Sequence, residues 1–253
     1  EEHDAMIRDI ECPTCGVVSK EASWELCKEL VFDPILGTEH EQAKTRPVLI
    51  NYSVGTSRFE KIPDADDLSS LNRAGDLVAD LGFPLVKLIP GKETQRNVSR
   101  GITHLHHFFT ARELVAVSKI MEAVRQISDY QVRDALNFSL TACLPYASKM
   151  RRFRADRKGG GPLSGTLYVS SLTTPPNVLN SFLRNAETVS GSLSYQRRTV
   201  RRNIVSTQSA TSLSGLPDKS IDYIFVDPPF GSNFDYSELN FFWEGLLGVT
   251  TQQ

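Results

Sequence analysis

The 253-residue sequence predicts an α/β protein, and three observations support this fold class. The run from Ile221 to Val226 is apolar and rich in β-branched and aromatic residues, which is typical of a buried strand. Residues 110–124 and 128–143 repeat apolar side chains at helical spacing. The chain is 40% hydrophobic and 23% charged, the composition of a globular protein long enough for one large core or two small ones.

Composition also excludes several classes of protein. No apolar run approaches the roughly 20 residues that a membrane-spanning helix needs. The acidic start, Glu1 to Asp4, is the reverse of a signal peptide. A net charge of −2 excludes a polycationic tail but leaves room for a local basic groove. We therefore expect a cytoplasmic protein with no membrane partner.

The N-terminal part contains a cysteine pair of the kind that binds metal. Cys12 and Cys15 form Cys-Pro-Thr-Cys-Gly, and four cysteines in the chain are too few for a disulfide scaffold. A tetrahedral zinc site needs four ligands. Cys27 is a candidate third ligand and His3 a poorly spaced one, so the remaining ligands either precede Glu1 or are lost. Cys143, in a helical apolar stripe, is predicted to belong to the core.

The local pattern predicts the remaining elements in order. Residues 21–30 suggest a short helix, 46–53 an extended segment, 64–81 a weak helix and 82–100 a loop. Thr110 and Glu113 have the spacing of a capping box that starts a helix, and residues 128–131 repeat that pattern. Pro145 is expected to kink or end the second helix.

A change of composition near residue 160 predicts a domain boundary. Residues 149–158 are strongly basic and are followed by three glycines and Pro162. We divide the chain into residues 1–160 and 161–253. Beyond the boundary, residues 166–170 predict a strand and residues 177–183 a helix.

Two basic runs, 149–158 and 197–202, stand out in a chain of negative net charge. Localised positive charge of this kind is what contacts to nucleic-acid phosphates need. The candidate phosphate ligands are Arg151, Arg152, Arg154, Arg198 and Arg201. The three histidines of residues 104–107 have no carboxylate pattern beside them, which favours loop or half-buried histidines over a metal cluster.

The most informative motif is Asp227-Pro228-Pro229-Phe230, directly after the predicted strand 221–226. That position places it at the carboxyl edge of a sheet, where ligands bind in open α/β folds. The two prolines fix the backbone and remove two amide donors, so the loop is stiff and its carbonyls are free to accept hydrogen bonds.

This motif resembles that of the amino-methyltransferases that methylate the exocyclic nitrogen of adenine or cytosine in DNA. The lead-in 216–226 and the aromatic-rich follow-on 231–244 are similar to the same family, in particular to bacterial adenine-specific methylases with a Cys-rich ribbon insert. The resemblance covers about residues 203–248. It is weaker for the cysteine pair and for residues 108–114.

The resemblance implies the architecture. Residues 161–253 would be part of a Rossmann-like methyltransferase sheet that uses S-adenosylmethionine. Residues 1–160 would be an α+β insert, a candidate target-recognition region, with a zinc-ribbon remnant in residues 1–30. The glycine-rich turn that holds the cofactor in this family is absent from the sequence, so we expect a fragment of a longer protein.

The resemblance also assigns roles to residues. Asp227 and the Pro228 carbonyl would accept the two hydrogens of the amine, exposing its lone pair to the methyl donor. Phe230 would stack on the base, which must first leave the duplex. Asn233 and Tyr236 would line the base pocket, whereas Phe241, Phe242 and Trp243 are expected to pack in the core. Asp227 and Ser209 are the candidate neighbours of the cofactor, although Ser209 lies where the family often has an acidic residue.

The expected activity is methylation of adenine N6 in DNA, of restriction–modification or phage-defence type, with a partner endonuclease or defence-system subunit. Cytosine N4 in DNA and guanine N2 in RNA are alternative targets. The alternative from another class is a non-catalytic DNA-binding module in which the Asp227 loop is vestigial. S-adenosylmethionine is the expected cofactor, with structural zinc at Cys12 and Cys15.

Overall fold

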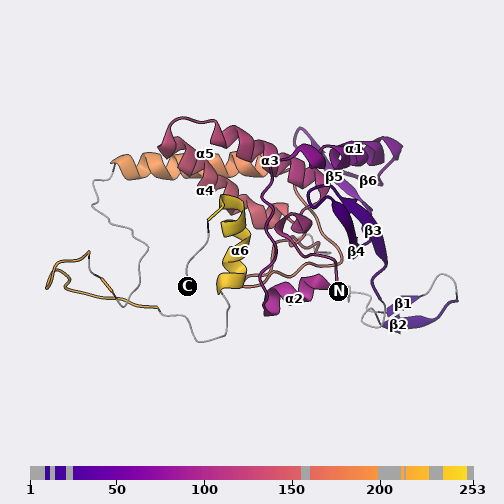
Figure 1. Cartoon of the computed structure of the whole chain (residues 1–253). Helices are drawn as coiled ribbons and strands as arrows, with labels where there is room; N and C mark the ends of the chain where they lie inside the picture. Colours follow the sequence, from indigo (N-terminus) through magenta and orange to yellow (C-terminus); the bar gives the residue numbers. More distant parts are fainter. Residues whose placement is uncertain are drawn as a thin grey trace, which may run out of the picture.

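The computed structural model describes residues 9–11, 15–20, 25–154, 160–198, 212–213, 215–227 and 236–249. Within these ranges the protein is a mixed α/β structure, as the fold class predicts (Figure 1). The longest helices lie along one side, the small hairpins lie toward one end, and the C-terminal helix lies below the long helices in this view.

The strands within the described ranges form three separate antiparallel hairpins. They are β1 (Asp9–Glu11) with β2 (Val18–Lys20), β3 (Lys28–Asp33) with β4 (Thr38–Ala43), and β5 (Ile50–Val54) with β6 (Ser57–Lys61). The extended segment expected in 46–53 is confirmed in part by β5. The helix expected across residues 21–30 is wrong at its described end, because Lys28 already pairs with Ala43 in a ladder.

Helices occupy most of the described remainder. They are α1 (Ala65–Asp76), α2 (Lys92–Val98), α3 (Ala111–Arg125), α4 (Tyr130–Ala147), α5 (Val178–Arg198) and α6 (Tyr236–Leu247), with 3-10 helices η2 (Val78–Asp80) and η3 (Leu105–Phe108). The helices expected in 64–81, 110–124, 128–143, 177–183 and after the motif are confirmed. The loop expected over 82–100 is corrected, because it contains α2. Pro145 lies in the last turn of α4, two residues before the helix ends.

The two predicted helix starts use different caps. Asp129 caps α4 in the usual way, because its carboxylate accepts hydrogen bonds from the amides of Gln131 and Val132 at 2.9 and 3.2 Å. Thr110 precedes α3, but its hydroxyl donates a hydrogen bond to the carboxylate of Glu113. It accepts no hydrogen bond from a backbone amide of the first turn. The spacing therefore located both helices but identified the capping bonds of neither, because the residue that caps α4 is Asp129 and not Ser128.

One hydrophobic core joins residues from both sides of residue 160. Phe108 and Phe242 are both 0% exposed, with ring centroids 5.4 Å apart in an edge-to-face arrangement. Val178 and Phe182 of α5 belong to the same core as α3 and α4. Cys143 is also buried there, as predicted. The division at residue 160 stays a prediction, and a boundary there would cut through this core.

Helix α6, which follows the Asp-Pro-Pro-Phe motif, is fixed to α2 by a buried carboxylate. Glu238 accepts hydrogen bonds from the Thr94 amide at 2.8 Å and the Thr94 hydroxyl at 3.2 Å. Its negative charge lies at the N-terminus of α2, where the helix dipole favours it. Gly91 leaves the necessary space, because a Cβ there would lie 2.0 Å from Cδ of Glu238.

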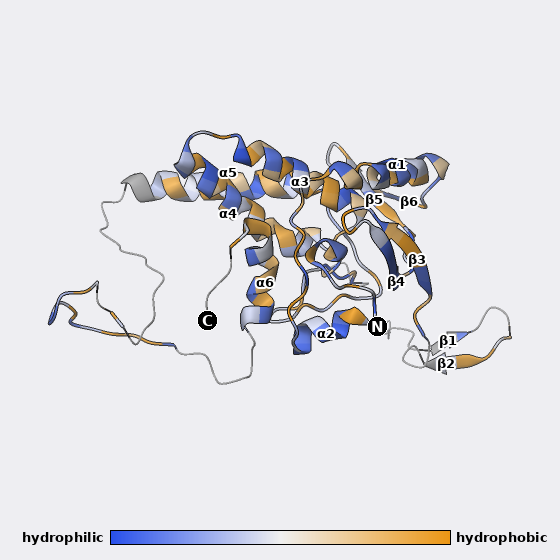
Figure 2. Ribbon diagram, in the orientation of Figure 1, coloured by the Kyte–Doolittle hydropathy of each residue, from blue (hydrophilic) through white to orange (hydrophobic). Residues whose placement is uncertain are grey.

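The predicted strand at residues 221–226 is not formed. Residues 215–227 make no ladder, and Tyr223 and Phe225 are each 79% exposed. Figure 1 shows this segment apart from the helices, and Figure 2 colours several of its residues as hydrophobic. A strand needs a hydrogen-bonded neighbour, and no described residue pairs with this segment. The described residues therefore show no parallel, Rossmann-like sheet.

The second predicted strand, residues 166–170, is also irregular. Side chains of α2 take the place of a neighbouring strand: Asn97 donates to the Leu167 carbonyl at 2.8 Å, and Glu93 accepts from the Leu167 amide at 3.1 Å. Leu167 and Val169 are nevertheless buried. The apolar run predicted burial correctly, but such a short run does not determine the type of backbone structure.

Candidate functional sites

The motif loop contributes one described residue, Asp227, and it is exposed. It stands at the end of the irregular segment 215–227. Pro228, Pro229, Phe230, Asn233 and Ser209 lie outside the described residues, so their predicted roles stay predictions. Tyr236 is the first residue of α6 and is 53% exposed. The motif is thus followed closely by an anchored helix and preceded by a segment that pairs with no described strand.

The predicted zinc ligands are described only in part. Cys15 is exposed and forms no disulfide, while Cys12 lies outside the described residues. Cys27, the candidate third ligand, is also exposed. Zinc at Cys12 and Cys15 stays a prediction.

The predicted phosphate ligands differ in their surroundings. Arg151 and Arg152 are half-buried, and their Nε atoms donate to the carbonyls of Gly160 and Gly161 at 3.4 and 3.2 Å. Arg154 is exposed. Arg198 is the last residue of α5, and Arg201 lies outside the described residues. The two half-buried arginines therefore tie Gly160 and Gly161 to the segment that follows α4.

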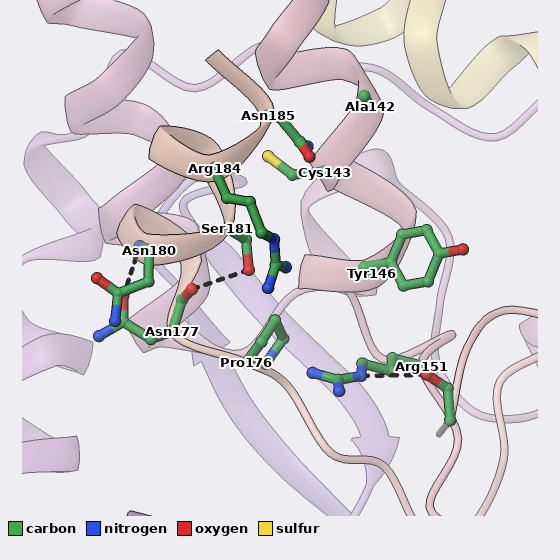
Figure 3. A pocket seen from close by; sticks show the side chains of 11 residues that line it. Ala142, Cys143, Tyr146, Arg151, Pro176, Asn177, Asn180, Ser181, Arg184 and Asn185 are labelled. Atoms are coloured by element: carbon green, nitrogen blue, oxygen red, sulfur yellow. Dashed lines mark hydrogen bonds between the residues drawn. The ribbon is translucent and has the colours of Figure 1, made fainter. Parts of the chain in front are cut away.

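Arg151 also lines a cavity of about 510 Å³ between the C-terminal half of α4 and the first turns of α5 (Figure 3). The lining residues are Ala142, Cys143, Tyr146, Arg151, Gly160, Pro176, Asn177, Asn180, Ser181, Arg184 and Asn185. This size is within the range of small-ligand sites. Burial raises the pKa of the Cys143 thiol to about 11, so this lining residue is not a nucleophile at neutral pH.

Positive charge dominates the cavity. Among the described residues that line it, Arg151 and Arg184 are the charged ones. Burial and the nearby charge of Arg184 both lower the pKa of Arg151. Figure 3 shows the two guanidinium groups on either side of Pro176. In the described ranges, neither guanidinium forms an ion pair with a carboxylate. The cavity is therefore suited to an anion.

Arg184 and the polar residues of α5 were missed from the sequence. A helix that ends at residue 183 excludes Arg184, whereas α5 continues to Arg198. The sequence nevertheless contains a pattern that could have found them. Asn177, Asn180, Ser181 and Arg184 follow the i, i+3, i+4, i+7 spacing of one helix face, which places their side chains together.

This cavity does not fit the expected cofactor. S-adenosylmethionine carries a sulfonium cation, and two arginines with no carboxylate among the described lining residues disfavour a cation. Of the two residues predicted to lie near the cofactor, Asp227 is exposed and does not line the cavity. The described residues thus offer no fit for S-adenosylmethionine at this cavity.

A second cluster connects the β3–β4 hairpin to η3. His106 and His107 point their Nε2 atoms at the same carboxylate oxygen, Asp33 Oδ2, at 2.8 and 2.7 Å. The other oxygen of Asp33 accepts hydrogen bonds from the amides of Ile35 and Leu36. All three side chains are buried. The expectation of loop or half-buried histidines is corrected for His106 and His107, because the fold supplies a carboxylate from a distant strand.

The Asp33 cluster has a metal-like ligand set, since its three ligand atoms lie within 4.8 Å of one another. Its hydrogen bonds favour another interpretation. The Thr103 amide donates to Nδ1 of His107 at 3.1 Å, so the proton of a neutral His107 lies on Nε2. A protonated Nε2 donates to Asp33 and has no lone pair for a metal ion. As folded, the cluster is a hydrogen-bonded clamp.

The protonation states agree with a clamp around one buried negative charge. Burial lowers the pKa of His106, and it lowers that of His107 to about 3, so both rings are neutral at pH 7. Burial acts to raise the pKa of Asp33, but the hydrogen bonds from His106 and His107 outweigh it and the net pKa is lowered. Nδ1 of His106 has no hydrogen-bond partner among the described residues.

No family model, curated protein or solved structure matches the chain. Among the described helices, none combines the length and hydrophobicity that a bilayer span requires. The function must therefore be inferred from the motif and from the sites themselves.

Proposed function

We propose that the chain carries the catalytic loop of a methyltransferase that transfers a methyl group from S-adenosylmethionine to N6 of adenine in DNA. The observation that carries this proposal is the sequence Asp227-Pro228-Pro229-Phe230 between an apolar strand-like run and a buried helix. Glu238 and Phe242 support it, because they fix α6, and with it the C-terminal end of the loop, to the core.

The chemistry follows from the groups in the loop. The exocyclic nitrogen of adenine is a poor nucleophile because its lone pair is delocalised into the ring. The Asp227 carboxylate and the Pro228 carbonyl accept its two hydrogens and favour a pyramidal nitrogen with an available lone pair. The cofactor supplies an electrophilic methyl group when it is bound. Phe230 stacks on the extruded base and orients it.

This function requires residues 221–226 to be paired as a strand in the active protein. The segment has the composition of an inner strand, and its large apolar side chains are exposed in the structure. Burying one such side chain contributes about 1.5–3 kcal/mol. We infer that these residues enter a sheet when neighbouring strands are present, and that Asp227 then stands at the carboxyl edge.

Methyl transfer tests the proposal directly. The protein expressed from its complete coding sequence is incubated with methyl-labelled S-adenosylmethionine and DNA, and the methylated nucleoside is identified by mass spectrometry. We expect N6-methyladenine, and a loss of activity of more than about 100-fold in Asp227→Ala, because a group that contacts the reacting amine is removed. Asp222→Ala, which removes an exposed carboxylate of the same segment, is the matched control and should retain activity.

Other products would redirect the proposal. N4-methylcytosine or, with RNA as substrate, N2-methylguanine would keep the loop chemistry and change the target. Full methylation by Asp227→Ala would overturn the catalytic role.

The second candidate function is a non-catalytic DNA-binding module, favoured by the exposed Asp227 and the arginine-lined cavity. It predicts DNA binding with no methylated product from the complete protein. In either function we expect a cytoplasmic protein that works with an endonuclease or defence-system subunit, with structural zinc at Cys12 and Cys15.

A further inference from the structure

We propose that the cavity between α4 and α5 binds a backbone phosphate of DNA through Arg151 and Arg184. The inference rests on the proposed function for the identity of the nucleic acid. The preference of the cavity for a phosphate group rests on its own residues.

The first argument is uncompensated charge. Arg151 and Arg184 line one cavity, and none of the described residues that line it carries a carboxylate. Two like charges close together repel, and burial of Arg151 strengthens that repulsion because water screens it less. A bound anion removes the repulsion. An anion in contact with both guanidinium groups is therefore the ligand that the cavity favours most.

The second argument is hydrogen-bonding capacity. The one hydrogen bond of the Arg151 side chain within the described ranges runs from Nε to the Gly160 carbonyl. No described group accepts from the Arg184 guanidinium. The side chain of Asn177 accepts from the Asn180 amide, which leaves its NH₂ group as a donor. Planar guanidinium forks match the oxygens of phosphate in bidentate pairs, so these donors suit a tetrahedral oxyanion.

The third argument is access. Arg184, Asn177 and Asn180 are exposed, and Tyr146, on the opposite wall in α4, is 51% exposed. Figure 3 shows Tyr146 and the α5 residues on different sides of the opening. A phosphate that belongs to a chain can therefore enter while its neighbours stay outside, and the ring of Tyr146 offers a face to a sugar or base.

Binding measurements without cofactor test this site separately from methylation. The affinity of the purified protein for a fluorescent single-stranded DNA oligonucleotide is measured across a salt series. We expect Arg184→Gln to weaken binding about tenfold at low salt and to reduce the salt slope by about one, uniformly across sequences. Arg184→Glu should weaken it further. Arg125→Gln, an exposed arginine in the last turn of α3 that does not line the cavity, is the control of equal charge change.

Three outcomes decide the inference. Weaker binding in both Arg184 variants with normal binding in Arg125→Gln supports it, and competition by inorganic phosphate that depends on Arg184 supports the chemistry of the ligand. Equal DNA binding by the Arg184 and Arg125 variants overturns it. Arg184-dependent binding of inorganic phosphate with DNA binding unaffected assigns the cavity to a free phosphate and overturns the DNA contact. A protein that binds DNA through Arg184 but never methylates it disproves the proposed function alone.

Discussion

The Asp33 cluster and the segment 215–227 differ in opposite ways: the structure reveals the first and the sequence motif marks the second. Asp33, His106 and His107 carry no recognisable motif, yet the fold buries them together and satisfies most of their hydrogen-bonding groups. Residues 215–227 lead into the most recognisable motif of the chain, yet they are exposed and unpaired. A motif indicates chemistry, whereas burial and contacts indicate what holds the fold together. The two kinds of signal need not coincide in one place.

The largest expected difference is in the stability lost when a phenylalanine is removed from the buried core and when one is removed from the exposed segment 215–227. Phe242→Ala removes a fully buried ring from the core and should lower the free energy of unfolding by about 3–5 kcal/mol. Phe225→Ala changes a ring that is 79% exposed and should cost less than about 0.5 kcal/mol. Urea unfolding followed by circular dichroism measures both.

The same pair of variants tests the sheet that the proposed function requires. A cost at Phe225 close to that at Phe242, in the protein expressed from its complete coding sequence, would show that the segment is packed there. An unchanged stability in that protein would contradict a buried strand at residues 221–226.

A smaller effect is expected at the clamp itself. Asp33→Asn leaves an oxygen for the turn amides but places an NH₂ group opposite the Nε2 donors of His106 and His107. Because this leaves buried donors without an acceptor, we expect a loss of about 2–3 kcal/mol in the free energy of unfolding. Asp129→Asn is the matched control, since asparagine caps a helix as well as aspartate and the site is exposed. Equal unfolding midpoints for these two variants would show that the clamp contributes little.

These contrasts explain what the sequence could and could not predict. Helices with strong periodicity, such as α3 and α4, were predicted because each turn places apolar residues on one face. The strands predicted at 166–170 and 221–226 are not formed, since a strand depends on partners distant in sequence that the local pattern does not show. The Asp33 clamp depends on a contact across more than 70 residues. Arg184 lay beyond the predicted end of its helix, although its spacing from Asn177 marked the shared face.

Taken per unit of pH, the smallest expected effect is that of pH on the free energy of unfolding, and its sign distinguishes a neutral clamp from a charged one. The pKa of His107 is about 3 in the folded protein against an ordinary value of 6.5. Below pH 6.5 the unfolded chain therefore binds a proton that the folded protein does not. Stability from this group is complete above 6.5 and falls as the pH drops toward 3, by about 1 kcal/mol per pH unit.

The other two groups of the clamp, His106 and Asp33, change stability with pH in the same direction. The lowered pKa of His106 adds to the loss, and Asp33, whose pKa is lowered, keeps its contribution until the pH falls below its ordinary value of 3.8. Urea unfolding between pH 7.5 and 4.5 (a range chosen around the ordinary histidine pKa) measures the slope. His107→Gln can retain a donor to Asp33 and an acceptor for Thr103, and it should flatten the slope by about one proton. Stability that rises on acidification from pH 7, and that no longer rises in His107→Gln, would instead show that Asp33 holds a protonated imidazole. The comparison with His107→Gln is needed because burial raises the pKa of Glu113, which gives the same sign.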